Sequence, residues 1–536
     1  MPPTLAPGAE GQVEARQDLD SIKPLTVDPP PVWTRRWVSL LAVLVVLGAA
    51  VLGGARWRQQ HCGLTPFAVD AATLQAMGDE CIGVSAYGFS FQANDARLSA
   101  VEDTVAGLNR RAEDLHRASP SRPYFSLVFV AALSSLAQPP DELFTERESL
   151  EGLAVAQSRQ LDKNGPGDPI VRLLLANAGD RVLHGPDVAG ILKQMTADDP
   201  SIIGVVGLEQ TREPTVRTIE ALNDVGLPML ATTLSADGLT QHSPMYFQLS
   251  PQDRREGEVA AAYAARRLAV ASEPIARKVR ILYSADRQDT YSNNLREDLQ
   301  SSFAAKGVDF EVDTRAYVPA YSLAAQAPGT GPYQVGKDTC GYDGLVFFAG
   351  RPDDFATMLD GVNDSCNSRP PRILGDDDIS RFVADLGLRG RHPAIPFDYL
   401  SFALGSPFCI RQTDLWHTMG ILFPQACRGD SKDSSTDGYV ALSYDAVRTY
   451  VTAVEHLRES GGRLPLTPGA VWHELKGIHE TPLDGESGVI DFGGVVNQQV
   501  PTDKFIAVQR VEDGGEPKDQ GSCGRFAGRT SSPWCP

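Results

Sequence analysis

Residues 278–307 read KVRILYSADRQDTYSNNLREDLQSSFAAKG and place a strand pattern directly before a helix pattern. The run 278–284 combines β-branched, aromatic and apolar residues and predicts a strand. The run 291–306 spaces its apolar residues as an amphipathic helix does. A strand that leads into a helix is the repeating unit of a parallel α/β sheet, so the stretch indicates an α/β protein.

The same alternation extends on both sides of this stretch. The expected strands are 124–131, 170–176, 201–206, 228–232, 278–284, 308–313, 343–349 and 371–375, and the expected helices are 146–162, 186–197, 213–224, 253–269, 291–306 and 352–362. Such alternation implies doubly wound parallel sheets with helices on both faces. Ser250-Pro251 interrupts the chain halfway, so two sheets in two lobes are easier to build than one.

Further elements follow residue 375. Helical patterns at 437–460 and 467–477 precede two terminal strand candidates at 488–492 and 504–510. Residues 314–339 carry Pro, Gly and Ala without periodicity and indicate a loop.

The N-terminal part contains one apolar segment. Residues 37–55 read WVSLLAVLVVLGAAVLGGA, which is long enough to cross a bilayer as a helix. Trp37 and Trp57 flank it as an aromatic belt does, whereas a buried core helix is the alternative. The 36 residues before the segment are long for a secretory signal, so we expect an uncleaved signal anchor. Lys23, Arg35 and Arg36 precede the span closely, whereas Arg56 and Arg58 follow it, and this balance favours a cytoplasmic N-terminus.

All eight cysteines lie after this apolar segment: Cys62, Cys81, Cys340, Cys366, Cys409, Cys427, Cys523 and Cys535. An even number on one side of a span indicates disulfides in an oxidising compartment. Eight cysteines allow 105 pairings. The simplest pairing joins sequence neighbours (62–81, 340–366, 409–427 and 523–535), each worth roughly 2–4 kcal/mol. The expected location is a single-pass cell-membrane protein with its C-terminal domain outside the cytoplasm.

The flanking regions are expected to be simpler. Residues 1–36 are rich in Pro and acidic residues and predict a disordered cytoplasmic tail. Residues 59–121 are taken as a juxtamembrane segment with one amphipathic helix, marked by apolar residues from Leu98 to Leu115. That stripe is too short for a coiled coil and favours packing on the neighbouring domain. Residues 511–536 are expected to be a flexible tail closed by one disulfide.

Composition and motifs argue against several functions. The net charge of −19 would repel phosphate backbones, so nucleic acid is not an expected partner. The chain lacks the G-x-S-x-G, P-loop and G-x-G-x-x-G motifs, so we expect no enzyme activity and no cofactor. Asp376-Asp377-Asp378 lacks the alternating ligands and glycine turn of a calcium loop, so no metal is expected.

Two loops that follow predicted strands carry hydroxyl residues. Thr211 ends the segment GLEQT after the strand at 201–206, and Ser235 ends the segment TTLS after the strand at 228–232. Ligands in open α/β sheets bind at the carboxyl ends of strands, near helix N-termini. Helix N-capping explains Ser and Thr at such places equally well.

An ordered series of segments between 124 and 510 resembles the type I periplasmic (Leu/Ile/Val-binding-like) solute-binding protein family. The series is FVAALSS, LAVAQSRQLDKNG, IIGVVGLEQT, GLPMLATTLSADGLT, YFQLSPQDRREGEVAAAYAARRL, the stretch at 278–307, YDGLVFFAGRPDDFATML, SYDAVRTYVTAVEHL and GESGVIDFGGVV. Each piece is short and degenerate, but the ordered series is much more specific. The transmembrane anchor and residues 59–121 depart from soluble or lipid-anchored members.

The resemblance implies a two-lobed clamp over 122–510 that closes on a small solute. Lobe 1 would comprise about 122–248 and 379–486, and lobe 2 about 249–378 and 487–510, with crossovers near 247–251, 376–380 and 484–490.

The resemblance also implies the ligand contacts. Thr211 and Ser235 would bind an anionic ligand group, Tyr291 would cover the ligand, and Asp377 would face its cationic group. Arg351 stands where the family often has an aromatic residue, and would meet a second anionic group. Leu208-Glu209-Gln210 also departs from the family's small and hydroxyl residues, which puts an unmodified aliphatic amino acid in doubt.

Two functions remain open. The first is a solute-binding receptor for a small, amino-acid-like ligand, working with a membrane transporter or a signalling partner. The second is a degenerate clamp that serves as a structural or protein-interaction ectodomain. Ligand-induced thermal stabilisation would distinguish them, since a binder gains about 2.7 kcal/mol at 100 times its Kd.

Overall fold

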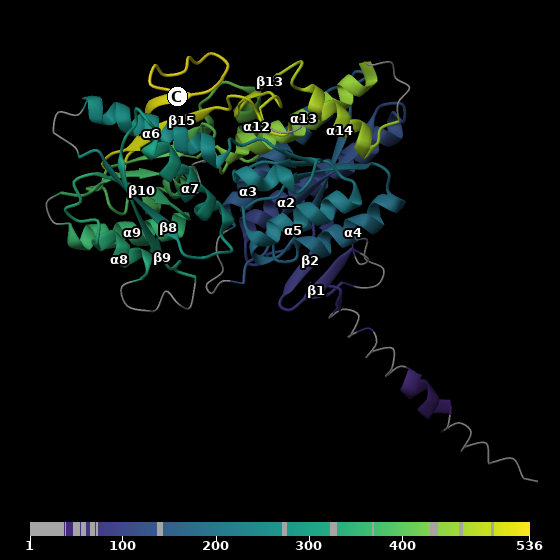
Figure 1. Cartoon of the computed structure of the whole chain (residues 1–536). Helices are drawn as coiled ribbons and strands as arrows, with labels where there is room; N and C mark the ends of the chain where they lie inside the picture. Colours follow the sequence, from purple (N-terminus) through teal and green to yellow (C-terminus); the bar gives the residue numbers. More distant parts are fainter. Residues whose placement is uncertain are drawn as a thin grey trace, which may run out of the picture. The chain divides into compact units, whose positions relative to one another are not determined.

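The structure of the 536-residue chain is a computed structural model (Figure 1). It describes residues 37, 39–46, 54, 60–64, 70, 73–136, 143–270, 276–321, 330–366, 369–428, 438–459, 465–494 and 498–536. The chain divides into two units, 1–57 and 58–536.

In the first unit, the described residues 37, 39–46 and 54 are helical. Across the described part of the chain, no helix combines the length and apolar character needed to cross a membrane. The remainder of the expected span at 37–55, and all of the expected tail at 1–36, lie outside the described residues.

Lobe 1 of the second unit is built on a seven-stranded sheet in the order β1-β2-β4-β3-β5-β6-β7. The strands are β1 (Leu74–Met77), β2 (Glu80–Ser85), β3 (Tyr124–Ala131), β4 (Ile170–Asn177), β5 (Ile202–Gly207), β6 (Met229–Ala231) and β7 (Tyr246–Gln248). β4, β3, β5, β6 and β7 are mutually parallel, and the β1–β2 hairpin joins β4 in antiparallel fashion.

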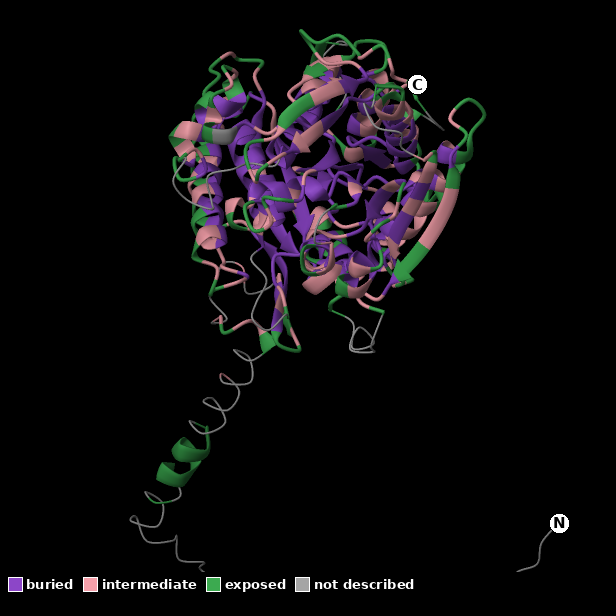
Figure 2. Cartoon of the chain, turned by 90° about the vertical axis from the view of Figure 1, so that its left-hand side faces the viewer, coloured by how far each residue is buried: buried purple, intermediate pink, exposed green. Residues whose placement is uncertain are grey.

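Helices cover both faces of this sheet (Figure 1). They are α2 (Ala96–Ala118), α3 (Phe144–Leu161), α4 (Gly185–Asp198), α5 (Glu213–Val225) and, from late in the chain, α12 (Asp414–Leu422), α13 (Tyr439–Glu459) and α14 (Pro468–Gly477). Leu127 and Phe129 of β3 join the core that contains α2, α3 and α13, whereas Val128 and Val130 join the core of α4 and α5. Successive side chains alternate between faces, so both faces of a strand this apolar are buried (Figure 2).

Lobe 2 has a second seven-stranded sheet in the order β16-β15-β12-β11-β10-β8-β9. Its strands are β8 (Lys278–Ser284), β9 (Glu311–Tyr317), β10 (Leu345–Ala349), β11 (Arg372–Gly375), β12 (Phe397–Ser401), β15 (Ile506–Val511) and β16 (Lys518–Cys523). Its helices are α6 (Asp253–Val270), α7 (Thr290–Ala304), α8 (Pro332–Lys337), α9 (Pro352–Ser365), α10 (Ile379–Ala384) and α11 (Leu386–Arg389). A small hairpin of β13 (Leu483–Gly485) and β14 (Gly488–Ile490) precedes β15.

The second crossover lies later than we expected. β12 pairs in parallel with β11 and antiparallel with β15, so the chain stays in lobe 2 through Ser401. The predicted crossover near 376–380, and the start of the second piece of lobe 1 at 379, are therefore wrong. The chain returns to lobe 1 between β12 and α12. The segment FDYLS at 397–401 is only five residues long, which is too short to predict a strand from the sequence alone.

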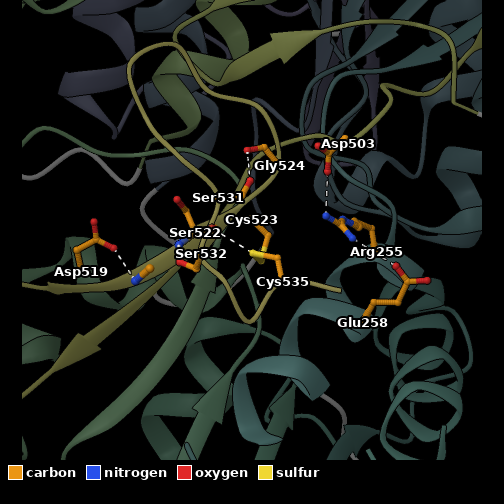
Figure 3. The surroundings of a disulfide bond; sticks show 11 residues. Arg255, Glu258, Asp503, Asp519, Ser522, Cys523, Gly524, Ser531, Ser532 and Cys535 are labelled. Atoms are coloured by element: carbon orange, nitrogen blue, oxygen red, sulfur yellow. Dashed lines mark hydrogen bonds and ion pairs between the residues drawn. A yellow bond between two sulfur atoms is a disulfide. The ribbon is translucent and has the colours of Figure 1, made fainter. Parts of the chain in front are cut away.

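The C-terminal residues contain a strand that we did not expect. β16 pairs with β15, and Cys523 of β16 is joined to Cys535 (Figure 3). The Ser532 amide donates to the Ser522 carbonyl at 2.8 Å, and the Trp534 ring lies 5.5 Å from the ring of Tyr263 in α6. The prediction of a flexible tail over 511–536 is wrong for this segment, because backbone pairing and a disulfide fix it.

Residues 59–121 also differ from the prediction. β1 and β2 extend the sheet of lobe 1, so this region is part of the lobe rather than a separate juxtamembrane segment. The amphipathic stripe is confirmed as a packing face, since Leu98, Val101 and Val105 of α2 are buried in the core of lobe 1.

The four neighbour-to-neighbour disulfides are confirmed: Cys62–Cys81, Cys340–Cys366, Cys409–Cys427 and Cys523–Cys535. Their Cα atoms lie 5.1–5.5 Å apart, which is normal for the bond. Each closes a short loop within one lobe.

Helix α13 is held against the sheet of lobe 1 by a buried tyrosine. The Tyr450 hydroxyl donates to the carbonyls of Val205 at 3.0 Å and Pro228 at 2.7 Å. A Cβ on Gly204 would come within 2.5 Å of the Tyr450 ring, so only glycine fits there. These hydrogen bonds fix α13, which lies late in the chain, against the sheet of lobe 1.

Candidate functional site at the junction of the lobes

The five predicted ligand-binding residues all follow carboxyl ends of parallel strands. Thr211 follows β5, Ser235 follows β6, Tyr291 follows β8, Arg351 follows β10 and Asp377 follows β11. All except Arg351 are buried, with exposed fractions of 2–3%. This is the edge at which open α/β sheets bind ligands.

Asp377 connects the two lobes through its carboxylate. Its Oδ1 accepts a hydrogen bond from the Tyr291 hydroxyl of lobe 2 at 2.6 Å, and its Oδ2 accepts one from the Tyr439 hydroxyl of lobe 1 at 2.9 Å. Burial and the neighbouring charge of Asp378 raise the pKa of Asp377 to about 7, although both tyrosine hydroxyls oppose the increase. A group that titrates near neutral pH therefore lies at the contact between the lobes.

Arg351 is engaged within lobe 2. Its guanidinium forms a bidentate pair with Asp289, at 2.6 and 3.1 Å, and a third hydrogen bond with Asp378 at 2.7 Å. The guanidinium also lies 4.7 Å from the centre of the Tyr291 ring. Asp289 and Asp378 thus already pair with the Arg351 guanidinium, which we expected to meet a second anionic group of the ligand.

Thr211 lies where the β5–α5 loop touches lobe 2. Its carbonyl accepts a hydrogen bond from the Tyr291 amide at 3.2 Å. Leu208 and Gln210 in the same loop have φ values of 55° and 63°, a left-handed conformation that is costly for such residues and is often found at functional sites. The capping alternative is wrong for Thr211, because Arg212 is the N-cap of α5 and no side chain caps that helix.

Ser235 contacts the first turn of α6 through its backbone. Its carbonyl accepts a hydrogen bond from the Asp253 amide at 2.8 Å. Ser235 caps no helix either, since the adjacent 3-10 turn begins after Ala236 and has no side-chain cap. The β6 loop of lobe 1 therefore meets lobe 2 at the start of α6.

Sequence reasoning missed four residues of this junction: Asp253, Glu256, Asp376 and Tyr439. The Glu256 Oε1 accepts a hydrogen bond from the Asp377 amide at 3.0 Å. Burial first, and then the nearby carboxylates, raise the pKa of Glu256 and Asp376 well above normal, and burial does the same to Asp253. The spacing of Asp253 and Glu256 in the first helical turn after a crossover was the available signal.

The largest of the cavities described here does not involve the five predicted residues. It occupies about 610 Å³ between α3 and α13, with Arg159, Tyr444 and Glu486 among its walls. In the described part of the chain, no group of three or more His, Cys, Asp or Glu side chains is arranged to hold a metal ion.

Two doubly wound lobes, three crossovers and a junction at the carboxyl ends of the strands define a type I periplasmic-binding-protein fold. Solved structures of this class are similar to the chain.

A leucine-binding protein LivK from Thermotoga maritima has a TM-score of 0.54 at 14% identity, covering 75% of this chain and 99% of that one. A solute-binding protein of an ABC transporter from R. palustris in complex with 4-hydroxybenzoate has a TM-score of 0.55 at 16% identity, covering 75% and 97%. A substrate-binding protein from Desulfitobacterium hafniense, in complex with Leu, has a TM-score of 0.51 at 16% identity, covering 74% and 99%.

The predicted two-lobed fold is confirmed by these likenesses. No protein-family model matches the sequence, and no curated protein matches it.

Proposed function

We propose that this chain is a solute-binding receptor that holds a small molecule at the junction of its two lobes. The observation that supports this proposal is that residues of both lobes meet there: the Thr211 carbonyl of lobe 1 accepts a hydrogen bond from the Tyr291 amide of lobe 2, and Asp377 accepts hydrogen bonds from Tyr291 and from Tyr439 of lobe 1. Polar groups that converge on one buried point from two movable bodies suit a clamp whose closure encloses a solute. The similar structures with leucine and 4-hydroxybenzoate support a small organic ligand.

The proposal includes the location of the receptor. An anchor at 37–55 would hold the lobes outside the cytoplasm, where a transporter or signalling protein in the same membrane receives the bound form. The four disulfides support this location, because such bonds persist in oxidising compartments. Membrane fractionation of cells, with thiol labelling before and after reduction, tests it; free thiols in the unreduced native protein would contradict it.

A thermal-shift screen of the full-length protein in detergent against a metabolite panel tests binding. We expect at least one small solute to raise the melting temperature in a dose-dependent way, with a stabilisation that follows the ligand concentration relative to Kd. The matched control is Asp377→Ala, which should abolish that shift while the variant still unfolds cooperatively. A panel of amino acids, amines, aromatic acids and sugars that leaves the melting temperature unchanged would contradict the proposal.

One observation favours the second candidate, an interaction ectodomain that has lost its ligand. Tyr291, Tyr439 and Asp377 satisfy one another, and Arg351 is held by two aspartates. A clamp whose polar groups are paired internally can remain closed without a solute. Under this alternative, Tyr439→Phe would loosen the lobes, and no solute would restore the melting temperature.

A further inference from the structure

Four carboxyl groups lie buried together at the junction without a cationic partner. Asp253, Glu256 and Asp376 are fully buried, and Asp377 is 3% exposed. The hydrogen bond from the Asp377 amide to the Glu256 side chain links α6 to the β11–α10 loop. Burial above all, and to a smaller extent the charge of Asp377, raise the pKa of Asp253. No described lysine or arginine lies within ion-pair distance of any of the four side chains.

The neighbouring arginines already serve other carboxylates. Arg351 pairs with Asp289 and Asp378, and Arg381 lies 3.5 Å from Asp378. Arg381 also lies over the ring of Tyr439, at 4.8 Å from its centre, and acts on Asp377 only at longer range. The local balance of charge at the junction is therefore negative.

Several oxygens of the cluster lack hydrogen-bond partners among the described residues. Oε2 of Glu256 and Oδ1 of Asp376 are in this position, and so by distance and angle are both carboxyl oxygens of Asp253, although the Ser235 side chain lies near enough to lower the pKa of Asp253. Burying a polar atom without a partner costs roughly 1–3 kcal/mol, and burying an unpaired charge costs more. Such groups are retained in a folded protein where a proton or an external cation satisfies them.

Independent orphan groups come from lobe 1. Thr232 and Thr233 follow β6 with exposed fractions of 0% and 9%, and neither hydroxyl has a hydrogen-bond partner in the described chain. They precede Ser235, whose carbonyl bonds to the Asp253 amide. The loop that carries these two unsatisfied hydroxyls of lobe 1 therefore also contains Ser235, whose backbone contacts Asp253 of lobe 2.

We infer that the solute is an organic cation with several N–H donors, of the diamine or guanidinium class. This inference rests on the proposed function and adds the ligand class. Ammonium or guanidinium donors would satisfy the orphan oxygens of both lobes, since each makes charge-assisted hydrogen bonds to carboxylates.

The test measures binding of agmatine, putrescine, leucine and benzoate to the full-length protein by isothermal titration calorimetry at pH 8. We expect agmatine or putrescine to bind, and Asp253→Asn and Glu256→Gln each to weaken that binding about tenfold or more. Glu258→Gln is the matched control, because Glu258 lies on the same helix and 44% of its side chain is exposed. It should leave the affinity within about twofold, as surface charges contribute little.

The outcomes separate the two claims. Binding of leucine or benzoate without binding of either amine overturns the cation inference and leaves the receptor function standing. Unchanged amine affinity in both Asp253→Asn and Glu256→Gln also overturns it. Binding of none of the four probes counts against the inference, and a negative metabolite screen in addition would remove the receptor function as well.

Discussion

Replacement of Asp377 by Asn should stabilise the protein by about 4 kcal/mol at pH 8 and by about 1.5 kcal/mol at pH 5. The pKa of Asp377 rises from 3.8 to about 7 because the carboxyl is buried beside Asp378. Between pH 3.8 and 7 the folded protein therefore keeps Asp377 protonated, whereas the unfolded chain has lost that proton. The free energy of unfolding falls over this range as the pH rises. Each pKa unit corresponds to about 1.4 kcal/mol, so ionised Asp377 costs the folded protein about 4 kcal/mol above pH 7. The amide resembles the protonated acid and removes that cost.

The assay is urea unfolding of the full-length protein in detergent, followed by circular dichroism at pH 5 and pH 8. Asp378→Asn is the matched control, because the pKa of Asp378 is lowered where that of Asp377 is raised, so its replacement should change the stability in the opposite direction. Burial opposes the ionisation of Asp378, but Arg381 and Arg351 outweigh it and lower its pKa, so its carboxylate stabilises the fold above the normal pKa and loses that effect as the pH falls. Removing it should destabilise the protein by about 3–5 kcal/mol at pH 8, because two arginines lose a buried partner. If Asp377→Asn destabilises the protein at pH 8 as much as at pH 5, the carboxylate is ionised and needed, and this reasoning fails.

Three further predictions concern single contacts. Gly204→Ala should lower the free energy of unfolding by about 1–3 kcal/mol in urea titrations, because the new Cβ meets the Tyr450 ring; a neutral result would show that α13 can shift. Cys535→Ser should cost about 2–4 kcal/mol and expose the C-terminal segment to limited proteolysis, unless β16 holds without its disulfide. Tyr439→Phe should cost about 1.5–3 kcal/mol at pH 8, where Asp377 is ionised, and about 1 kcal/mol at pH 5, and equal losses at both pH values would exclude a charged acceptor.

The sequence was sufficient for the elements whose signals are local. Strand–helix alternation placed β3, β8 and α7 within a residue or two. β3 is almost entirely apolar, β8 concentrates β-branched, apolar and aromatic residues, and α7 has a helical period of apolar residues. The prediction that each cysteine pairs with its sequence neighbour is confirmed, because each pair closes a loop inside one lobe. The ordered family-like segments placed all five predicted residues at the carboxyl ends of strands.

Only the tertiary structure decided which strands share a sheet and which charges meet. β12 is five residues long and its antiparallel partner β15 lies more than 100 residues later, so nothing local marks it as a member of lobe 2. β16 follows β15 closely, but its sequence KDQGSC has no apolar strand pattern. The junction also depends on contacts between residues that are far apart in the sequence: Tyr439 lies 62 residues from Asp377, and Glu256 lies 121 residues from it. Burial without a counter-charge is a property of the assembled junction, because the same carboxyls would be hydrated in an extended chain.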